Sequence, residues 1–188
     1  MPDRIKLVFP EISARIKENN GDKYIWDSLR GRWLLLTPEE WVRQNTIGWL
    51  VSEKGVPELR ISQEYPVDIN GQHQRADIVV IDERAMPHIL VECKAPDVEI
   101  DNDVVMQAIR YNTVVKARYI LLTNGVKLYC FEYTDGKYRA VKEFWVVSRV
   151  ECGKEKSWKL NAKLSQTIAG LAQFLYIYAL VFNSVIGL

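Results

Sequence analysis

Two runs of apolar residues, each interrupted by a single charge, occupy the middle of the chain. Residues 76–81 (Ala-Asp-Ile-Val-Val-Ile) and 89–93 (Ile-Leu-Val-Glu-Cys) are apolar at consecutive positions rather than at alternate ones. Strands that are covered on both faces have this pattern, whereas a strand with one face in solvent alternates. The sequence therefore predicts two central strands, within which the charges of Asp77 and Glu92 need an explanation.

Turn residues divide this region into a hairpin and a third strand. The segments 60–69 and 75–81 are rich in β-forming residues, and Asn70-Gly71 between them is typical of a tight hairpin turn. A tight turn at 83–87 leads into the third strand, 88–94. This order makes the strands that carry Asp77 and Glu92 antiparallel neighbours.

A helix is predicted to begin at Thr37-Pro38-Glu39-Glu40. Thr37 suits the N-cap, proline suits the first helical position, and Glu40 is placed to bond back to the N–H group of the cap. We expect this helix to continue to about Lys54 and to stop at Gly55.

Apolar residues at helical spacing predict a second helix over residues 101–116. The remaining strands are expected at 23–26, 33–36, 119–123, 126–133 and 138–147. A hydrophobic content of 48% in 188 residues is enough for a core without disulfides. The sequence therefore predicts one compact α/β unit over residues 1–148.

The end of the sequence differs from this unit. Residues 149–163 form a polar, lysine-rich linker, and residues 164–188 contain no charged side chain. A segment of this length can span a bilayer, with the lysines on the cytoplasmic side. The alternative is an apolar C-terminal helix that packs on the domain or on a second subunit, which the segment's five Ser, Gln and Asn side chains favour.

Charge and cysteine content exclude some classes of protein. The 25 basic and 24 acidic side chains leave a formal charge of +1, so nucleic-acid binding must rest on local patches. Cys93, Cys130 and Cys152 match neither a disulfide framework nor a zinc site, and the first residues lack a secretory signal pattern. These features predict a cytoplasmic protein, at the inner face of a membrane if the tail spans it.

Asp77, Glu92 and Lys94 are the candidate chemical centre. Burying two carboxylates together is unfavourable unless they share a cation, and Mg²⁺ prefers such oxygen ligands. The period of two in a strand places Glu92 and Lys94 on one face and Cys93 on the other. The alternative is a solvated edge strand that carries an ordinary ion pair.

The two predicted helices add further polar candidates. Gln107 and Tyr111 share one helix face, where they can hold Lys94 or a phosphate, or simply pack on the sheet. Glu40 is explained equally well as a capping residue. Arg43 and Gln44, one turn later, suit DNA phosphates or a surface ion pair.

Five motifs in this order resemble one known family. They are Thr-Pro-Glu-Glu-Trp-Val-Arg-Gln (37–44), Arg-Ala-Asp-Ile-Val-Val (75–80), Leu-Val-Glu-Cys-Lys-Ala-Pro (90–96), Gln-Ala-Ile-Arg-Tyr (107–111) and Leu-Thr-Asn-Gly (122–125). Over residues 5–147 the chain resembles the N-terminal nuclease domain of type I restriction enzyme R subunits, of the PD-(D/E)xK nuclease superfamily. This resemblance implies a restriction-endonuclease-like fold with a central mixed β-sheet flanked by helices.

The resemblance also implies roles for the candidate residues. Asp77 and Glu92, with the backbone carbonyl of Cys93, would bind Mg²⁺ or Mn²⁺, and Lys94 would position the attacking water. Gln107 and Tyr111 match the Gln-x-x-x-Tyr element of RecB-like members.

Glu40 matches the glutamate of the first helix in this family, with Glu39 as the alternative register. Arg43, Gln44 and Arg110 are the expected DNA contacts. The chain departs from the superfamily pattern in having Ala76 before Asp77 where the pattern has proline.

The sequence thus predicts a Mg²⁺-dependent deoxyribonuclease, a hydrolase of a restriction or defence system. Because 188 residues leave no room for the helicase motor of R subunits, we expect a homodimer or a separate helicase or specificity partner. One alternative is a catalytically silent nucleic-acid-binding or assembly module with the nuclease fold. Another is a membrane-tethered interaction protein, in which the apolar tail determines the function and the nuclease-like domain is auxiliary.

Overall fold

The computed structural model describes residues 5–142, and its larger sheet has six strands in the order in which they follow along the chain. Only the pairing of β6 with β7 is parallel, and all the others are antiparallel. The strands are β4 (Ile61–Ile69), β5 (Gln72–Ile81), β6 (Pro87–Cys93), β7 (Tyr119–Thr123), β8 (Leu128–Thr134) and β9 (Lys137–Ala140). The sheet is therefore mixed, with β5 and β6 both inside it, as predicted.

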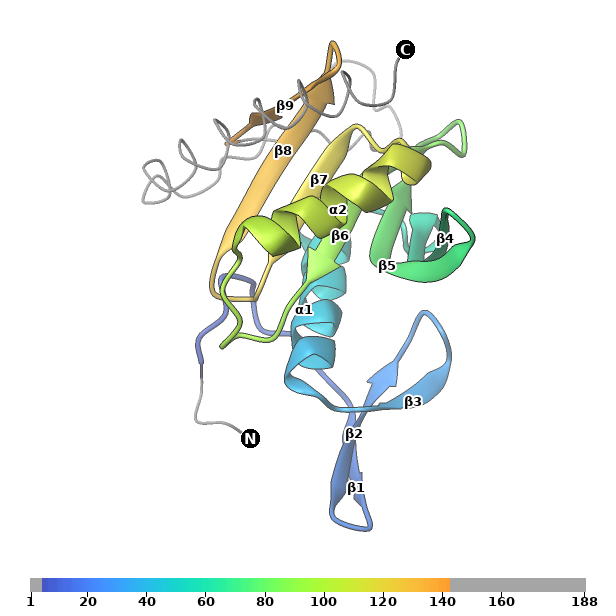
Figure 1. The fold of residues 1–188 in the computed structure, drawn as a ribbon. Helices are drawn as coiled ribbons and strands as arrows, with labels where there is room; N and C mark the ends of the chain where they lie inside the picture. Colours follow the sequence, from blue (N-terminus) through green and yellow to red (C-terminus); the bar gives the residue numbers. More distant parts are fainter. Residues whose placement is uncertain (1–4, 143–188) are drawn as a thin grey trace.

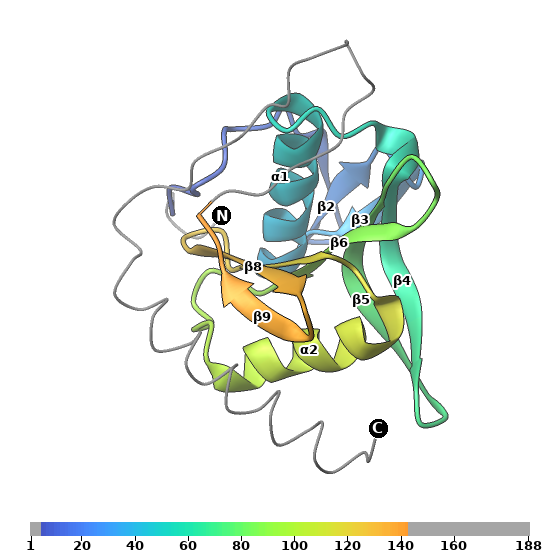
Figure 2. The ribbon, with the colours of Figure 1, turned by 90° about the horizontal axis from the view of Figure 1, so that it is seen from above.

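The two helices, α1 (Pro38–Ser52) and α2 (Asn102–Val115), cover opposite faces of this sheet (Figures 1 and 2). Val42 and Leu50 of α1 belong to the same core cluster as Val91 of β6. Ala108 of α2 belongs to the cluster that contains Leu90 on the other side of that strand. The flanked mixed sheet that the family resemblance implies is thus present.

Capping residues fix the helix ends close to the predicted positions. The Thr37 hydroxyl accepts a hydrogen bond from the Glu40 N–H at 3.0 Å, and Asp101 caps α2 in the same way. After Ser52 the chain turns at Gly55, whose φ of +68° is a conformation that glycine adopts at little cost. A short 3₁₀ turn, Glu58–Arg60, then leads into β4.

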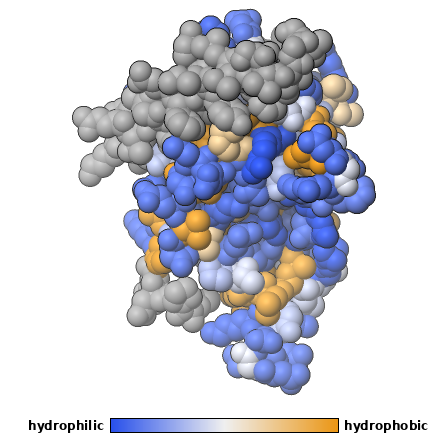
Figure 3. Space-filling view, viewed as in Figure 1, coloured by the Kyte–Doolittle hydropathy of each residue, from blue (hydrophilic) through white to orange (hydrophobic). Residues whose placement is uncertain are grey.

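A separate antiparallel sheet of three strands precedes α1. It consists of β1 (Ile16–Asn19), β2 (Asp22–Asp27) and β3 (Arg32–Leu35), and in Figure 1 it projects from the body at the lower end. The surface seen from this side is mostly hydrophilic, including the lower tip (Figure 3). Strands β2 and β3 agree with the prediction, whereas β1 is an addition to it.

Two other predicted boundaries differ. Strand β8 begins two residues after the expected Val126, and β9 ends at Ala140 rather than near residue 147, although residues 143–147 of that prediction lie outside the described residues. The linker 149–163 and the apolar segment 164–188 lie outside the described residues, so both stay predictions. Within residues 5–142, no helix is long and apolar enough to cross a membrane.

Candidate functional site

Asp77 and Glu92 lie side by side on neighbouring strands. The register of β5 and β6 pairs Ile78 with Val91, which places Asp77 opposite Glu92. Asp77 Oδ2 accepts a hydrogen bond from the backbone N–H of Cys93 at 2.7 Å. Glu92 is 3% exposed and lies on a strand with neighbours on both sides. The alternative of a solvated edge strand is therefore wrong.

A chain of hydrogen bonds leads from Glu92 to α2. Lys94 Nζ lies 2.8 Å from Glu92 Oε1 and 3.0 Å from Gln107 Oε1, and Gln107 Nε2 lies 2.9 Å from the Tyr111 hydroxyl. We call Glu92, Lys94, Gln107 and Tyr111 the lysine relay. The residues predicted to act together are thus joined by direct contacts, because α2 crosses over between the parallel strands β6 and β7 on the face that carries Lys94.

Glu40 also lies at this centre. Its Oε2 accepts a hydrogen bond from Arg43 NH1 at 2.7 Å, and its Oε1 accepts one from Gln44 Nε2 at 2.9 Å. The backbone N–H of Thr37, to which a closed capping box would direct Glu40, donates instead to Leu35 O at 3.0 Å. The capping-box explanation therefore accounts for Thr37 but not for the carboxylate of Glu40.

Arg43 joins the helix to the strand. Its NH2 group lies 2.6 Å from Asp77 Oδ1 and 3.4 Å from Glu39 Oε1, while NH1 binds Glu40. Arg43 and Gln44 are buried, and these donors face carboxylates rather than open solvent. Arg110 is exposed on α2. The assignment of these three side chains to DNA contacts stays a prediction.

Three charged residues that the sequence did not single out complete this network. Asp27 is fully buried and accepts hydrogen bonds from the backbone N–H groups of Leu29 and Arg30, each at 3.0 Å. The side chain of Arg30 pairs with Asp27 and lies 3.3 Å from Glu64. We call Asp27, Arg30, Glu40, Arg43, Glu64 and Asp77 the arginine-bridged cluster.

Glu64 has an unusual backbone within a strand, with φ at +49°. It falls between the pairs Gln63–Ile78 and Tyr65–Ala76, so it lies opposite Asp77. Residues with a side chain occupy this region at a cost, and such strain gathers at functional sites. Because the residue is neither glycine nor asparagine, the sequence gives no signal of this positive φ angle.

The surroundings of the relay shift its ionisation. Burial, followed by the charge of Asp77, raises the pKa of Glu92 to about 7. Burial opposes ionisation of Lys94, but the hydrogen bond and charge of Glu92 outweigh it and raise the pKa of Lys94. Lys94 is therefore a cation at neutral pH, suited to donating a hydrogen bond rather than to removing a proton.

One carboxylate oxygen at this centre lacks a partner among the described residues. Glu92 Oε2 is buried and accepts no hydrogen bond from them, although an unmet buried acceptor is costly. Within residues 5–142, no three His, Cys, Asp or Glu side chains form a metal-binding group. Two carboxylates with one open oxygen nevertheless fit Mg²⁺, which takes most of its ligands from water and phosphate.

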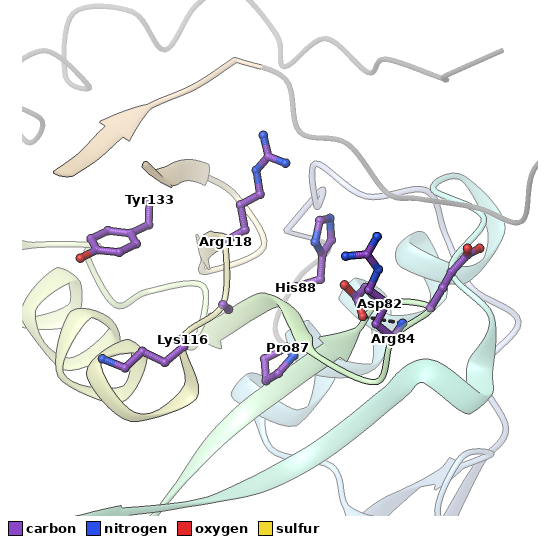
Figure 4. A pocket seen from close by; sticks show the side chains of 9 residues that line it. Asp82, Arg84, Pro87, His88, Lys116, Arg118 and Tyr133 are labelled. Atoms are coloured by element: carbon purple, nitrogen blue, oxygen red, sulfur yellow. Dashed lines mark hydrogen bonds between the residues drawn. The ribbon is translucent and has the colours of Figure 1, made fainter. Parts of the chain in front are cut away.

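A separate hollow lies at the opposite end of β6, where the strand begins. Its volume is about 610 Å³, and it is lined by Asp82, Glu83, Arg84, Pro87, His88, Lys116, Ala117, Arg118 and Tyr133. Figure 4 shows basic side chains around it from the β5–β6 turn (Arg84) and from the connection between α2 and β7 (Lys116 and Arg118). None of the residues predicted to carry the chemistry lines this hollow.

Comparison with known families places most of the described chain in one family. The model of the family described as "Type I restriction enzyme R protein N terminus (HSDR_N)" matches residues 38–144, a range that begins with α1 and includes the whole larger sheet. A search of curated proteins found no match.

Proposed function

The chain belongs to the family of type I restriction enzyme R protein N-terminal domains, and on that basis we propose that it is a metal-dependent deoxyribonuclease. The proposed reaction is hydrolysis of a DNA phosphodiester bond by water. Asp77, Glu92 and Lys94 are the proposed catalytic residues, with Glu40, Gln107 and Tyr111 around them.

The observation that carries this proposal is the surroundings of Glu92. One of its oxygens binds Lys94, the other is buried without a partner within residues 5–142, and Asp77 lies opposite. A divalent cation held by Asp77, Glu92 and the carbonyl of Cys93 would satisfy that oxygen and neutralise both carboxylates. When bound, Mg²⁺ or Mn²⁺ supplies Lewis acidity toward a phosphate oxygen and lowers the pKa of bound water.

The relay residues have separate roles in this proposal. Lys94, kept cationic by Glu92, donates a hydrogen bond to the attacking water or to the phosphate. Gln107 fixes the position of the Lys94 ammonium through its Oε1, and Tyr111 fixes the Gln107 amide. A lysine held by two partners loses rotational freedom before substrate arrives, which favours reaction.

Arg43 favours a second candidate function. Its guanidinium already neutralises Asp77 Oδ1 and Glu40, so a metal ion must compete with it for Asp77. This arrangement is also what a catalytically silent nucleic-acid-binding or assembly module would have, with arginine as the permanent counter-ion. The two functions differ in whether divalent cations bind and whether DNA is cut.

Cleavage of plasmid and linear DNA in Mg²⁺ or Mn²⁺ tests the proposal. We expect the purified chain to cut, and Glu92→Gln and Lys94→Ala to lose about 10²–10⁴-fold of the rate. Glu132→Gln is the matched control, because this glutamate pairs with Arg118 away from the centre. If a folded wild-type chain cuts no DNA while binding it without metal, the module is the correct function.

A further inference from the structure

One face of the small sheet combines aromatic rings with basic side chains. The register pairs Lys17 with Tyr24 and Trp26 with Trp33, and the Trp26 N–H donates to Arg15 O at 2.9 Å. Cross-strand partners and alternate residues share a face of a sheet, so these five side chains lie together. We call them the aromatic–basic face.

The cations of this face lie over its rings. The Arg15 guanidinium is 5.0 Å from the Trp26 ring centre, and Lys17 Nζ is 4.6 Å from that of Trp33. The two indoles meet edge to face at 5.4 Å. Arg15 and Lys17 are exposed, and the aromatic side chains are partly exposed. Rings and positive charges are therefore presented to solvent side by side.

We propose that the aromatic–basic face binds single-stranded DNA next to the proposed catalytic centre. Bases stack on aromatic rings while phosphates pair with Lys and Arg, and a single strand exposes both groups at once. Stacking of a base on an aromatic ring is worth more than an exposed cation–π contact. Bases therefore displace Arg15 and Lys17 from the rings, and the freed cations bind phosphates.

The face is continuous with the proposed catalytic centre. Strand β2 ends at Asp27, and the turn that follows carries Arg30, which lies 3.7 Å from Glu40. A hollow of about 380 Å³ is lined by Arg15 and Trp26 of the face and by Gln44 of α1, which binds Glu40. The hollow thus connects the aromatic–basic face to α1, the helix that carries Glu40.

This surface is an addition to the part of the chain that the family model matches. Strands β1 to β3 end at Leu35, before the matched range 38–144 begins. The inference rests on the proposed function for the role of the bound strand. Binding itself is measured without metal, so it can fail while cleavage is observed, and the reverse.

Fluorescence anisotropy of a labelled single-stranded oligodeoxynucleotide, measured in EDTA, tests the inference. We expect Trp33→Ala to weaken binding about tenfold and Trp33→Phe, which keeps a stacking ring, to weaken it much less. Arg15→Ala and Lys17→Ala should each reduce the slope of log affinity against log salt by about 0.7. Circular dichroism checks that each variant is folded.

Lys23 and Arg32 are the matched controls, because they alternate with Tyr24 and Trp33 and so belong to the other face of the same sheet. Lys23→Ala and Arg32→Ala should leave affinity and salt slope close to wild type. Equal losses on both faces would overturn the inference. Tighter binding of duplex DNA, or of RNA of the same sequence, would also overturn it.

Discussion

The arginine-bridged cluster and the lysine relay meet at Asp77 and Glu92 but differ in what surrounds their buried carboxylates. In the cluster, the pKa values of Asp27 and Glu64 are lowered, because hydrogen bonds and charge from Arg30 outweigh the effect of burial. In the relay, the pKa of Glu92 is raised to about 7 by burial and by Asp77. Burial also raises the pKa of Glu40, on the side of the cluster next to Arg43. Arg30 thus stabilises the anions of Asp27 and Glu64, whereas the surroundings of Glu92 disfavour its anion.

This difference indicates that the two faces of the sheet have different roles. The cluster fixes β2, α1, β4 and β5 relative to one another through ion pairs among its own residues. Arg30 NH1 and NH2 and Arg43 Nε donate no hydrogen bond within the described residues, but all the carboxylates of the cluster face an arginine. The relay keeps a carboxylate oxygen without a partner among the described residues, which a cation would satisfy. Stability should therefore depend on the cluster, and response to pH and metal on the relay.

The largest effect on stability is expected from removing Arg30, the cation that pairs with Asp27. Arg30→Met leaves the fully buried Asp27 carboxylate without its ion-pair partner, and we expect the free energy of unfolding to fall by about 3–5 kcal/mol. Urea denaturation measures this loss. Arg118→Met, which breaks an exposed pair with Glu132, is the control and should cost about 1 kcal/mol or less. Similar losses would contradict the stabilising role of the cluster.

Next in size is the effect of pH on the relay. The folded pKa of Glu92 lies above its unfolded value of 4.5, so its contribution to stability is full below pH 4.5 and is lost as pH rises through about 7. Glu92→Gln mimics the protonated form, and without metal it should be more stable than wild type by roughly 1–3 kcal/mol at pH 8. The difference should vanish near pH 4.5. Denaturation in EDTA at both pH values measures it, and a constant difference would refute the assignment.

A smaller effect should link the two regions through Arg43. Arg43→Gln removes the competitor for Asp77 Oδ1 and makes the centre more negative, so Mn²⁺ should bind about tenfold more tightly. Electron paramagnetic resonance of free Mn²⁺ measures the affinity. Arg75→Gln, which removes an exposed partner of Glu64, should leave it unchanged. Unaltered affinity in Arg43→Gln would show that arginine and metal do not compete.

The smallest effect is expected at the far end of the relay. Tyr111→Phe removes one hydrogen bond to Gln107, which is worth about 0.5–1.5 kcal/mol, and so should slow cleavage by up to about tenfold. Single-turnover kinetics at saturating DNA measures the rate. Tyr133→Phe, on β8, is the control for loss of a tyrosine hydroxyl. An unchanged rate in Tyr111→Phe would place Tyr111 outside the functional relay.

The fold follows from the sequence where the signals are local. Asn70-Gly71 and the apolar runs determine the β4–β5–β6 order, and the caps Thr37 and Asp101 mark both helix starts. Strand β1 lacks such a signal, because Ile-Lys-Glu-Asn is exposed at all four positions and alternates no apolar face. It forms by pairing with β2, so its formation depends on the neighbouring strand rather than on its own sequence.

The contacts of the candidate site also separate into those that local sequence signals predict and those that they do not. Asp77, Glu92 and Lys94 converge because a hairpin register and a period of two bring them together, and both can be read from the sequence. Arg43 reaches Asp77 across 34 positions and Gln63 reaches Asp27 across 36, and no spacing rule connects such pairs. The pairing within the arginine-bridged cluster was therefore not predictable from the sequence, although three of its members, Glu40, Arg43 and Asp77, were singled out there.

Cys93 lies between Glu92 and Lys94, so the rate at which its thiol is alkylated can measure local opening of β6. Its side chain is completely buried, and burial raises the pKa of its thiol well above the usual value, so alkylating reagents should reach it only when β6 opens. With Cys130 and Cys152 replaced by alanine, the labelling rate of Cys93 would measure how often the carboxylate strand opens. Slower labelling on addition of a divalent cation would show the ion closing that strand.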